Sequence, residues 1–210
     1  MTTHVRQATA ADVPAMVEIH LRAFPDFFLS QLGRPFLRRL YAGFVREASG
    51  CALIAQQGGA VVGYIAGTSR PERYFRERLH REGLAFACNA LPGLLRAPAR
   101  TAERLWSALR YRGERPPDLP EGWLVSSVAV DPGARAGGTG SALVRAFCAR
   151  AAAARAPWVY LLTDESGNDE VQAFYKRAGF QLHSRIVRSG GRVMRVYVQE
   201  PSRPEASHVG

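Results

Sequence analysis

Apolar residues in the first third of the chain follow two periods, which predict helices and strands in turn. A spacing of three to four residues is typical of a helix with one buried face, and short apolar runs bounded by turn residues are typical of strands. The predicted elements are a strand at 5–8, a helix at 9–24, a helix after Pro35, and strands at 51–55 and 60–66 joined through Gly58 and Gly59.

In the last third, strand and helix patterns alternate. The predicted elements are strands at 123–130 and 159–163, helices at 136–155 and 170–177, and a closing hairpin of strands 181–187 and 192–198. A strand, a helix and a strand in succession imply a parallel crossover. The fold class is therefore predicted to be α/β (α+β), with a mixed central sheet.

Residues 69–121 separate these two regions and have a different character, being basic, interrupted by proline and rich in helix formers. We interpret them as a helical insertion that lies over the sheet, within a single domain of residues 1–200. Apolar positions between Leu95 and Leu109 recur at helical spacing beside a row of arginines, which leaves membrane or partner contact as an alternative. Packing against its own domain is favoured. Residues 201–210 are predicted to be a flexible tail.

Composition and charge narrow the class of protein. The chain has 210 residues, 47% of them hydrophobic, and a formal charge of +10 that could attract nucleic acid, anionic lipid or a small polyanion. No run approaches the roughly 18 to 20 apolar residues of a membrane span, so we expect a cytoplasmic protein. Three cysteines, at 51, 88 and 148, stand singly, which argues against a metal site or a disulfide framework.

A glycine-rich motif follows the predicted strand at 123–130 and opens the next helix. It contains Arg135, Gly138 and Gly140 in the pattern Arg-x-x-Gly-x-Gly. Glycines remove the Cβ atoms that would block close approach, so backbone N–H groups can point at a phosphate at the positive end of the helix. No lysine follows, as a P-loop requires, and Leu143 stands where a dinucleotide fingerprint needs its third glycine.

A second motif lies downstream, in the segment Asn168-Asp-Glu-Val-Gln-Ala-Phe-Tyr175-Lys-Arg-Ala-Gly-Phe180. Its Asn, Phe-Tyr and Gly-Phe positions and the preceding glycine motif together resemble the GNAT superfamily of acetyl-CoA-dependent N-acetyltransferases. One departure is Val171, where the family usually places alanine. That exchange replaces one apolar side chain with another.

The resemblance implies a GNAT fold, with about seven strands, helices on both faces, splayed central parallel strands and the helical insertion before the fourth strand. It implies acetyl-CoA as co-substrate without a metal, and direct attack by a primary amine in a ternary complex. The coenzyme-binding residues that it implies are Val128, Ala129, Val130, Arg135, Ala136, Gly137, Gly138, Thr139, Gly140, Ser141, Asn168, Phe174 and Lys176. For Phe174, a place in the core is the favoured interpretation.

Two catalytic residues are named on the same basis. The phenol of Tyr175 is protonated at neutral pH and could donate its proton to the departing thiolate. Ser126 is proposed to hold a water molecule, because the strand offers no carboxylate. Asp164 and Glu165 are alternative bases, although solvation at a strand end is the favoured interpretation for both. His20 and His183 are lone histidines, interpreted as structural.

The acceptor is not identified by the sequence. The aromatic segment 24–28 would suit a sugar, a nucleotide-linked amino sugar or an apolar amine, and a packing contact between two helices is an equal interpretation. Four arginines of the insertion would suit an anionic acceptor such as a nucleotide sugar; these are Arg70, Arg73, Arg76 and Arg78. Two alternatives stay open: an inactive acyl-CoA-binding sensor, and a basic protein that binds nucleic acid or a membrane surface. With the transferase as the preferred interpretation, we expect no nucleic-acid partner, and we consider a homodimer.

Overall fold

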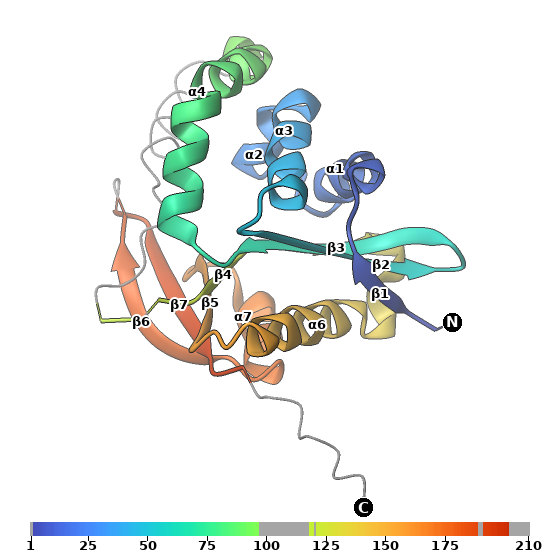
Figure 1. Cartoon of the computed structure of the whole chain (residues 1–210), viewed down its shortest axis with the longest axis vertical. Coiled ribbons are helices and arrows are strands. Elements are labelled where there is room, and N and C mark those ends of the chain that lie inside the picture. The colour runs from blue at the N-terminus through green and yellow to red at the C-terminus, as the bar shows by residue number, and fades with distance from the viewer. Residues whose placement is uncertain (1, 97–117, 120, 189–190, 202–210) are drawn as a thin grey trace, which may run out of the picture.

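The computed structural model describes residues 2–96, 118–119, 121–188 and 191–201. Its described strands form one mixed sheet in the order β1-β2-β3-β4-β5-β7-β6 (Figure 1). The strands are β1 (His4–Gln7), β2 (Gly50–Gln57), β3 (Ala60–Thr68), β4 (Trp123–Val130), β5 (Val159–Asp164), β6 (Gln181–Val187) and β7 (Val193–Gln199). Only β4 and β5 pair in parallel. The mixed seven-stranded sheet confirms the predicted fold class.

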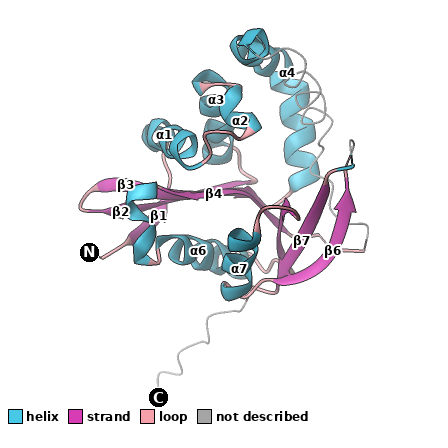
Figure 2. Ribbon diagram, turned by 180° about the vertical axis from the view of Figure 1, so that it is seen from behind, coloured by secondary structure: helices cyan, strands magenta, loops and turns pink. Residues whose placement is uncertain are grey.

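The helices form two layers, one on each face of the sheet (Figures 1 and 2). The described helices are α1 (Val13–Ala23), α2 (Phe28–Gln31), α3 (Arg34–Arg46), α4 (Pro71–Arg96), α6 (Thr139–Ala153) and α7 (Asp169–Arg177), with 3-10 turns η1 (Ala10–Asp12) and η2 (Pro132–Gly137). Side chains alternate along a strand, so β2 directs Ile54 into the α1–α3 layer and Leu53 into the α6–α7 layer. The sheet therefore has two cores.

The first helix begins later than the sequence predicts. Thr9 caps η1 and forms a capping box with Asp12, whose carboxylate accepts from the Thr9 backbone N–H at 2.7 Å and from Arg6 at 2.8 Å. The hydrogen bond from Arg6 lowers the pKa of Asp12 to about 2. The α-helix then starts at Val13, with Pro14 in its first turn, where a missing N–H costs no helical bond.

The insertion packs against the helical layer through α4. Gly43 of α3 faces Arg78 so closely that a Cβ atom there would lie 1.5 Å from the guanidinium Nη1. Arg78 is buried and donates to the backbone carbonyls of Arg39 and Leu40 at 2.9 and 3.1 Å. The described part of the insertion thus contacts α3, not the sheet alone, and Arg78 is engaged in packing, not offered to an acceptor.

Some predictions fall on residues that the structure leaves out. The apolar repeat between Leu95 and Leu109 and the tail at 202–210 lie outside the described residues, apart from the backbone at 95–96. Within the described helices, none is both long enough and apolar enough to cross a bilayer.

Candidate active site

The central parallel strands separate along their length. β4 and β5 pair only from Trp123 to Val125 on one side and from Val159 to Leu161 on the other, although both strands continue. The register between β3 and β4 shifts at the same point, leaving Ser126 as an extra residue. Such a β-bulge bends its strand and often lies beside an active site. The predicted splay of the central strands is therefore present.

The splay leaves one edge of β4 without a strand partner. Asp131 donates its backbone N–H to Val62 of β3 at 2.8 Å. Because successive residues of a strand point their backbone groups to opposite sides, Val128 and Val130 direct theirs away from β3, toward the gap beside β5. Buried backbone groups need partners, so this edge is suited to a ligand that carries amides.

The N-terminus of α6 forms an open cradle beside that edge. Gly138 lies in the left-handed region, with φ of 68°, where it ends η2 and begins α6. This break places the helix start at Thr139 and not at 136, as the sequence predicted. No side chain caps α6, and a Cβ atom on Gly138 would meet nothing within 4 Å. The first-turn N–H groups have no acceptor inside the helix and point out of its N-terminal end, the arrangement that binds anions in other helices.

Other predicted coenzyme-binding residues surround this cradle. A Cβ atom on Gly140 would lie 3.3 Å from the Phe174 ring and 3.7 Å from Val130, so α7, α6 and β4 meet there. Phe174 is half-buried against the core, consistent with both of its predicted roles. Thr139 is buried, and its hydroxyl accepts from Gln57 at 3.2 Å. Lys176 is exposed; the side chains of Arg135 and Ala136 lie outside the described residues.

Asn168 and Tyr175 approach the gap from the far strand and α7. Asn168 precedes α7, and its side-chain amide donates to the hydroxyl of Thr163 on β5. Tyr175 is 7% exposed, with its ring 5.1 Å from Phe174 and 5.7 Å from Phe180. Burial raises its pKa, so the phenol stays protonated. Among the described residues, no hydrogen bond engages its hydroxyl.

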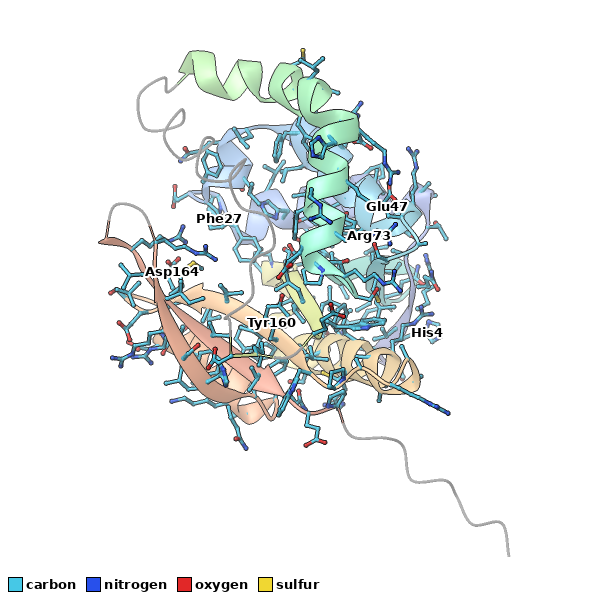
Figure 3. All side chains as sticks on the ribbon, turned by 60° about the vertical axis from the view of Figure 1, so that its left-hand side comes forward. His4, Phe27, Glu47, Arg73, Tyr160 and Asp164 are labelled. Carbon is cyan, nitrogen blue, oxygen red and sulfur yellow. The ribbon has the colours of Figure 1, made fainter. Side chains whose placement is uncertain are left out.

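The two carboxylates after β5 are occupied by arginines. Asp164 accepts from Arg192 at 2.5 and 2.6 Å, and Glu165 accepts from Arg195 at 2.9 Å and from Arg185 at 2.8 Å. Both carboxylates are therefore committed to ion pairs with arginines of β6, β7 and the turn between them. Figure 3 shows Asp164 and Phe27 on the same side of the molecule.

A buried polar cluster, which the sequence did not reveal, lies on the other face of β4. It consists of His20 of α1, Tyr41 of α3, Tyr64 of β3 and Ser127 of β4. His20 is therefore not a lone histidine. In the sequence, the two tyrosines and the histidine each occupy positions compatible with a packed face, and nothing in that pattern shows that their polar atoms meet.

Burial of His20 should make the stability of the protein depend on pH. His20 is 1% exposed, and desolvation lowers its pKa from 6.5 to about 4. The unfolded chain then takes up a proton first, so stability is fully present above pH 6.5 and falls as the pH drops toward 4, by about 3 kcal/mol at most. Unfolding in urea at pH 7 and 4.5 measures this loss. His20→Gln should reduce it and His183→Gln, at an exposed histidine, should not; equal losses in all three proteins would contradict this account.

Residues 104–182, which include β4, α6, β5 and α7, match the family described as acetyltransferase (GNAT) domain. The part of the chain that carries the candidate site is therefore similar to a GNAT acetyltransferase domain. No curated protein matches it in sequence.

Solved GNAT structures share the fold over nearly the whole chain. A GNAT-family acetyltransferase from Bacillus cereus ATCC 10987 is 13% identical, with a TM-score of 0.61, covering 97% of this chain and 100% of its own. The polyamine N-acetyltransferase of Drosophila melanogaster is 14% identical, with a TM-score of 0.61 and coverage of 95% and 100%. The ribosomal-protein-S18-alanine N-acetyltransferase of Escherichia coli is 12% identical, with a TM-score of 0.58 and coverage of 98% of both chains. At these identities the likeness concerns the fold.

Proposed function

We propose that this GNAT protein transfers an acetyl group from acetyl-CoA to a primary amine by direct attack in a ternary complex. The observation that carries the proposal is the splay of β4 from β5 directly beside the uncapped, glycine-rich start of α6. An extended arm that carries amides would fit the gap between β4 and β5, and a diphosphate would fit the N-terminus of α6. Coenzyme A carries both groups.

The fit assigns residues to each part of the coenzyme. The N–H groups of residues 138–141 would hold the pyrophosphate, where the helix dipole favours negative charge. Arg135 is proposed to add a positive charge, and Lys176 a second one from α7. The pantetheine arm would hydrogen-bond to Val128 and Val130 as an added strand, with Asn168 on the opposite side.

The same geometry suggests how the protein would promote the reaction. Acetyl-CoA supplies the activated acetyl group as a thioester. The Val128 N–H would polarise its carbonyl, because that group points into the gap. Tyr175, held neutral by burial, would protonate the departing sulfur. Ser126, exposed at the bulge, is proposed to hold a water molecule that takes up the proton lost by the attacking nitrogen, and Tyr175 would regain its proton from solvent.

The acceptor would lie against the α1–α3 layer, opposite the coenzyme. Phe27 is 42% exposed there, and its ring lies 6.3 Å from His20. An aromatic surface of this kind suits a sugar or an apolar amine. Two of the similar structures are named for unlike acceptors, a polyamine in one and an alanine of ribosomal protein S18 in the other, so several amine classes deserve testing. We further propose one domain over residues 1–200 and a cytoplasmic location.

Two measurements test the proposal. Calorimetric titration should show one acetyl-CoA site per chain, and a thiol-release assay should then show turnover with an amine. The panel should contain agmatine, an alanine-initiated peptide, an amino sugar and a nucleotide amino sugar. Binding without thiol release for every amine would favour an acyl-CoA sensor. If acetyl-CoA does not bind at all, the transferase assignment is refuted, and a basic protein that binds nucleic acid or a membrane surface becomes the favoured interpretation.

A further inference from the structure

Four side chains from four different elements bring their polar atoms together behind the β4 bulge. Tyr41 Oη lies 2.7 Å from His20 Nδ1 and 2.6 Å from Tyr64 Oη. Tyr64 Oη lies 3.0 Å from Ser127 Oγ and 3.1 Å from His20 Nδ1, and Tyr41 Oη lies 3.3 Å from Ser127 Oγ. These distances define a hydrogen-bonded chain that runs from the buried imidazole to a serine on the central strand.

Every member of this chain is uncharged at neutral pH. Desolvation lowers the pKa of His20 to about 4 and raises the pKa of Tyr41 to about 12, and it raises the pKa of Tyr64 further. Tyr41 and Tyr64 are fully buried, and His20 Nε2 has no hydrogen-bond partner among the described residues. No member of the hydrogen-bonded chain therefore gains or loses a proton near neutral pH. The chain can differ only in which group donates and which accepts each hydrogen bond.

The chemistry of the four groups decides that direction. An unprotonated imidazole nitrogen is the strongest acceptor among them, and a phenol is a more acidic donor than an alcohol. We assign the His20 proton to Nε2, so that Nδ1 accepts from Tyr41; with this tautomer, Tyr64 donates to Tyr41 and Ser127 donates to Tyr64. Each of the three hydroxyl protons is then used inside the chain. What Ser127 has left to offer is the lone pairs of its oxygen.

Ser127 is the member of the chain that a substrate can reach. It is half-buried, whereas the three residues behind it are at most 1% exposed. It lies between the bulged Ser126 and Val128, whose N–H is proposed to polarise the thioester. Its side chain joins Tyr41 and Tyr64 on the face of the sheet that the α1–α3 layer covers, where the acceptor is expected.

We propose that Ser127 Oγ accepts a hydrogen bond from the N–H of the incoming amine. Tyr64, Tyr41 and His20 would position Ser127, because the Ser127 hydroxyl donates its hydrogen bond to Tyr64 and so turns a lone pair of its oxygen toward the amine. The inference rests on the proposed function and assigns the group that touches the acceptor. An amine held by one N–H keeps its lone pair free to attack the thioester carbonyl. Ser127 would be a catalytic residue in this sense, and the other three would be positioning residues.

Substitution at Ser127 tests the contact directly. Ser127→Ala should lower kcat/KM for the amine by about tenfold, the effect of one lost hydrogen bond at a reacting nitrogen, without changing acetyl-CoA affinity. Ser127→Thr, which keeps the hydroxyl, should restore most of the activity. A Ser127→Ala protein with wild-type kcat/KM, or equal activity of the Ala and Thr variants, would overturn the contact.

The positioning residues are tested by combination and by pH. Tyr64→Phe should also lower kcat/KM, and the Ser127→Ala/Tyr64→Phe double variant should lose little more than Ser127→Ala alone, because both remove the same interaction. Each loss should be the same factor from pH 6.5 to 9. Additive losses would indicate independent structural roles, and a changed pH profile would indicate a proton-accepting base; either result would overturn the inference. Melting temperatures identify any variant that fails to fold.

Different results would refute the role of Ser127 and the proposed transferase function. If the wild-type protein transfers acetyl groups and Ser127→Ala does so equally well, only this inference falls. If the wild type binds acetyl-CoA and releases no thiol with any amine, the proposed function falls and this inference falls with it.

Discussion

Gly138→Asp is expected to weaken acetyl-CoA binding by about a hundredfold or more, because it places a carboxylate where a diphosphate must lie. Gly138 has φ of 68° and an open space where its side chain would be, so the new group would project without a clash into the cradle at the start of α6. Like charges at the same helix end repel, and the anion loses its access to the free N–H groups. Calorimetric titration with acetyl-CoA measures the effect.

Two control variants separate charge from backbone strain. Gly138→Asn has the same shape without the charge, and asparagine tolerates left-handed backbone better than most residues, so it should bind acetyl-CoA more tightly than the aspartate variant. Gly191→Asp introduces the same charge at a glycine with φ of 76° and equally open surroundings, two residues before β7 begins. It should bind normally. Equal affinities of wild type and Gly138→Asp would refute the cradle.

Tyr175→Phe should lower kcat by about a hundredfold or more, with acetyl-CoA affinity unchanged, because it removes the proposed proton donor and retains the ring. The ring packs between Phe174 and Phe180, so the variant should keep the local structure. The raised pKa of Tyr175 means that loss of its proton should not limit the wild-type rate at pH 9. Steady-state kinetics over pH 6.5 to 9 and calorimetry provide both readouts.

A matched variant tests whether any buried phenol would have the same effect. Tyr160→Phe removes a hydroxyl from a fully buried tyrosine of β5 that lies in a separate cluster with Leu124 and Val196. The Tyr160→Phe variant should keep kcat near the wild-type value, and its melting temperature measures any loss of stability. Unchanged turnover of Tyr175→Phe would remove that residue from the mechanism.

Local sequence signals predicted most of the fold. The strands β4 and β6 have the bounds that alternation and turn residues indicated, because both signals are read within a few neighbouring positions. The start of α6 was misplaced because Gly138 adopts a left-handed conformation that residue identity permits but does not require. The helix α2 was missed, since its four residues are too few for a period to be recognised.

The candidate site was predicted in part for the same reason. The glycines and Tyr175 lie in contiguous motifs, which sequence spacing can display. The cluster behind β4 depends on residues far apart in the chain, such as Tyr41 and Ser127, which are 86 positions apart. A periodic pattern indicates that such residues are buried and gives no information on which polar atoms meet. The bulge at Ser126 is likewise a property of pairing between two strands.

The insertion that contains α4 begins and ends at neighbouring positions of the sheet, so related proteins could carry different segments on the side where the acceptor is proposed to bind. β3 ends at Thr68, which pairs with Leu124 near the start of β4, so the intervening chain leaves the sheet and returns to almost the same point. Closure entropy grows only with the logarithm of length, so this excursion costs about 2 kcal/mol more than a short hairpin turn. Segments of different length and composition could therefore be exchanged at this junction, and the cradle at Gly138 would keep its geometry.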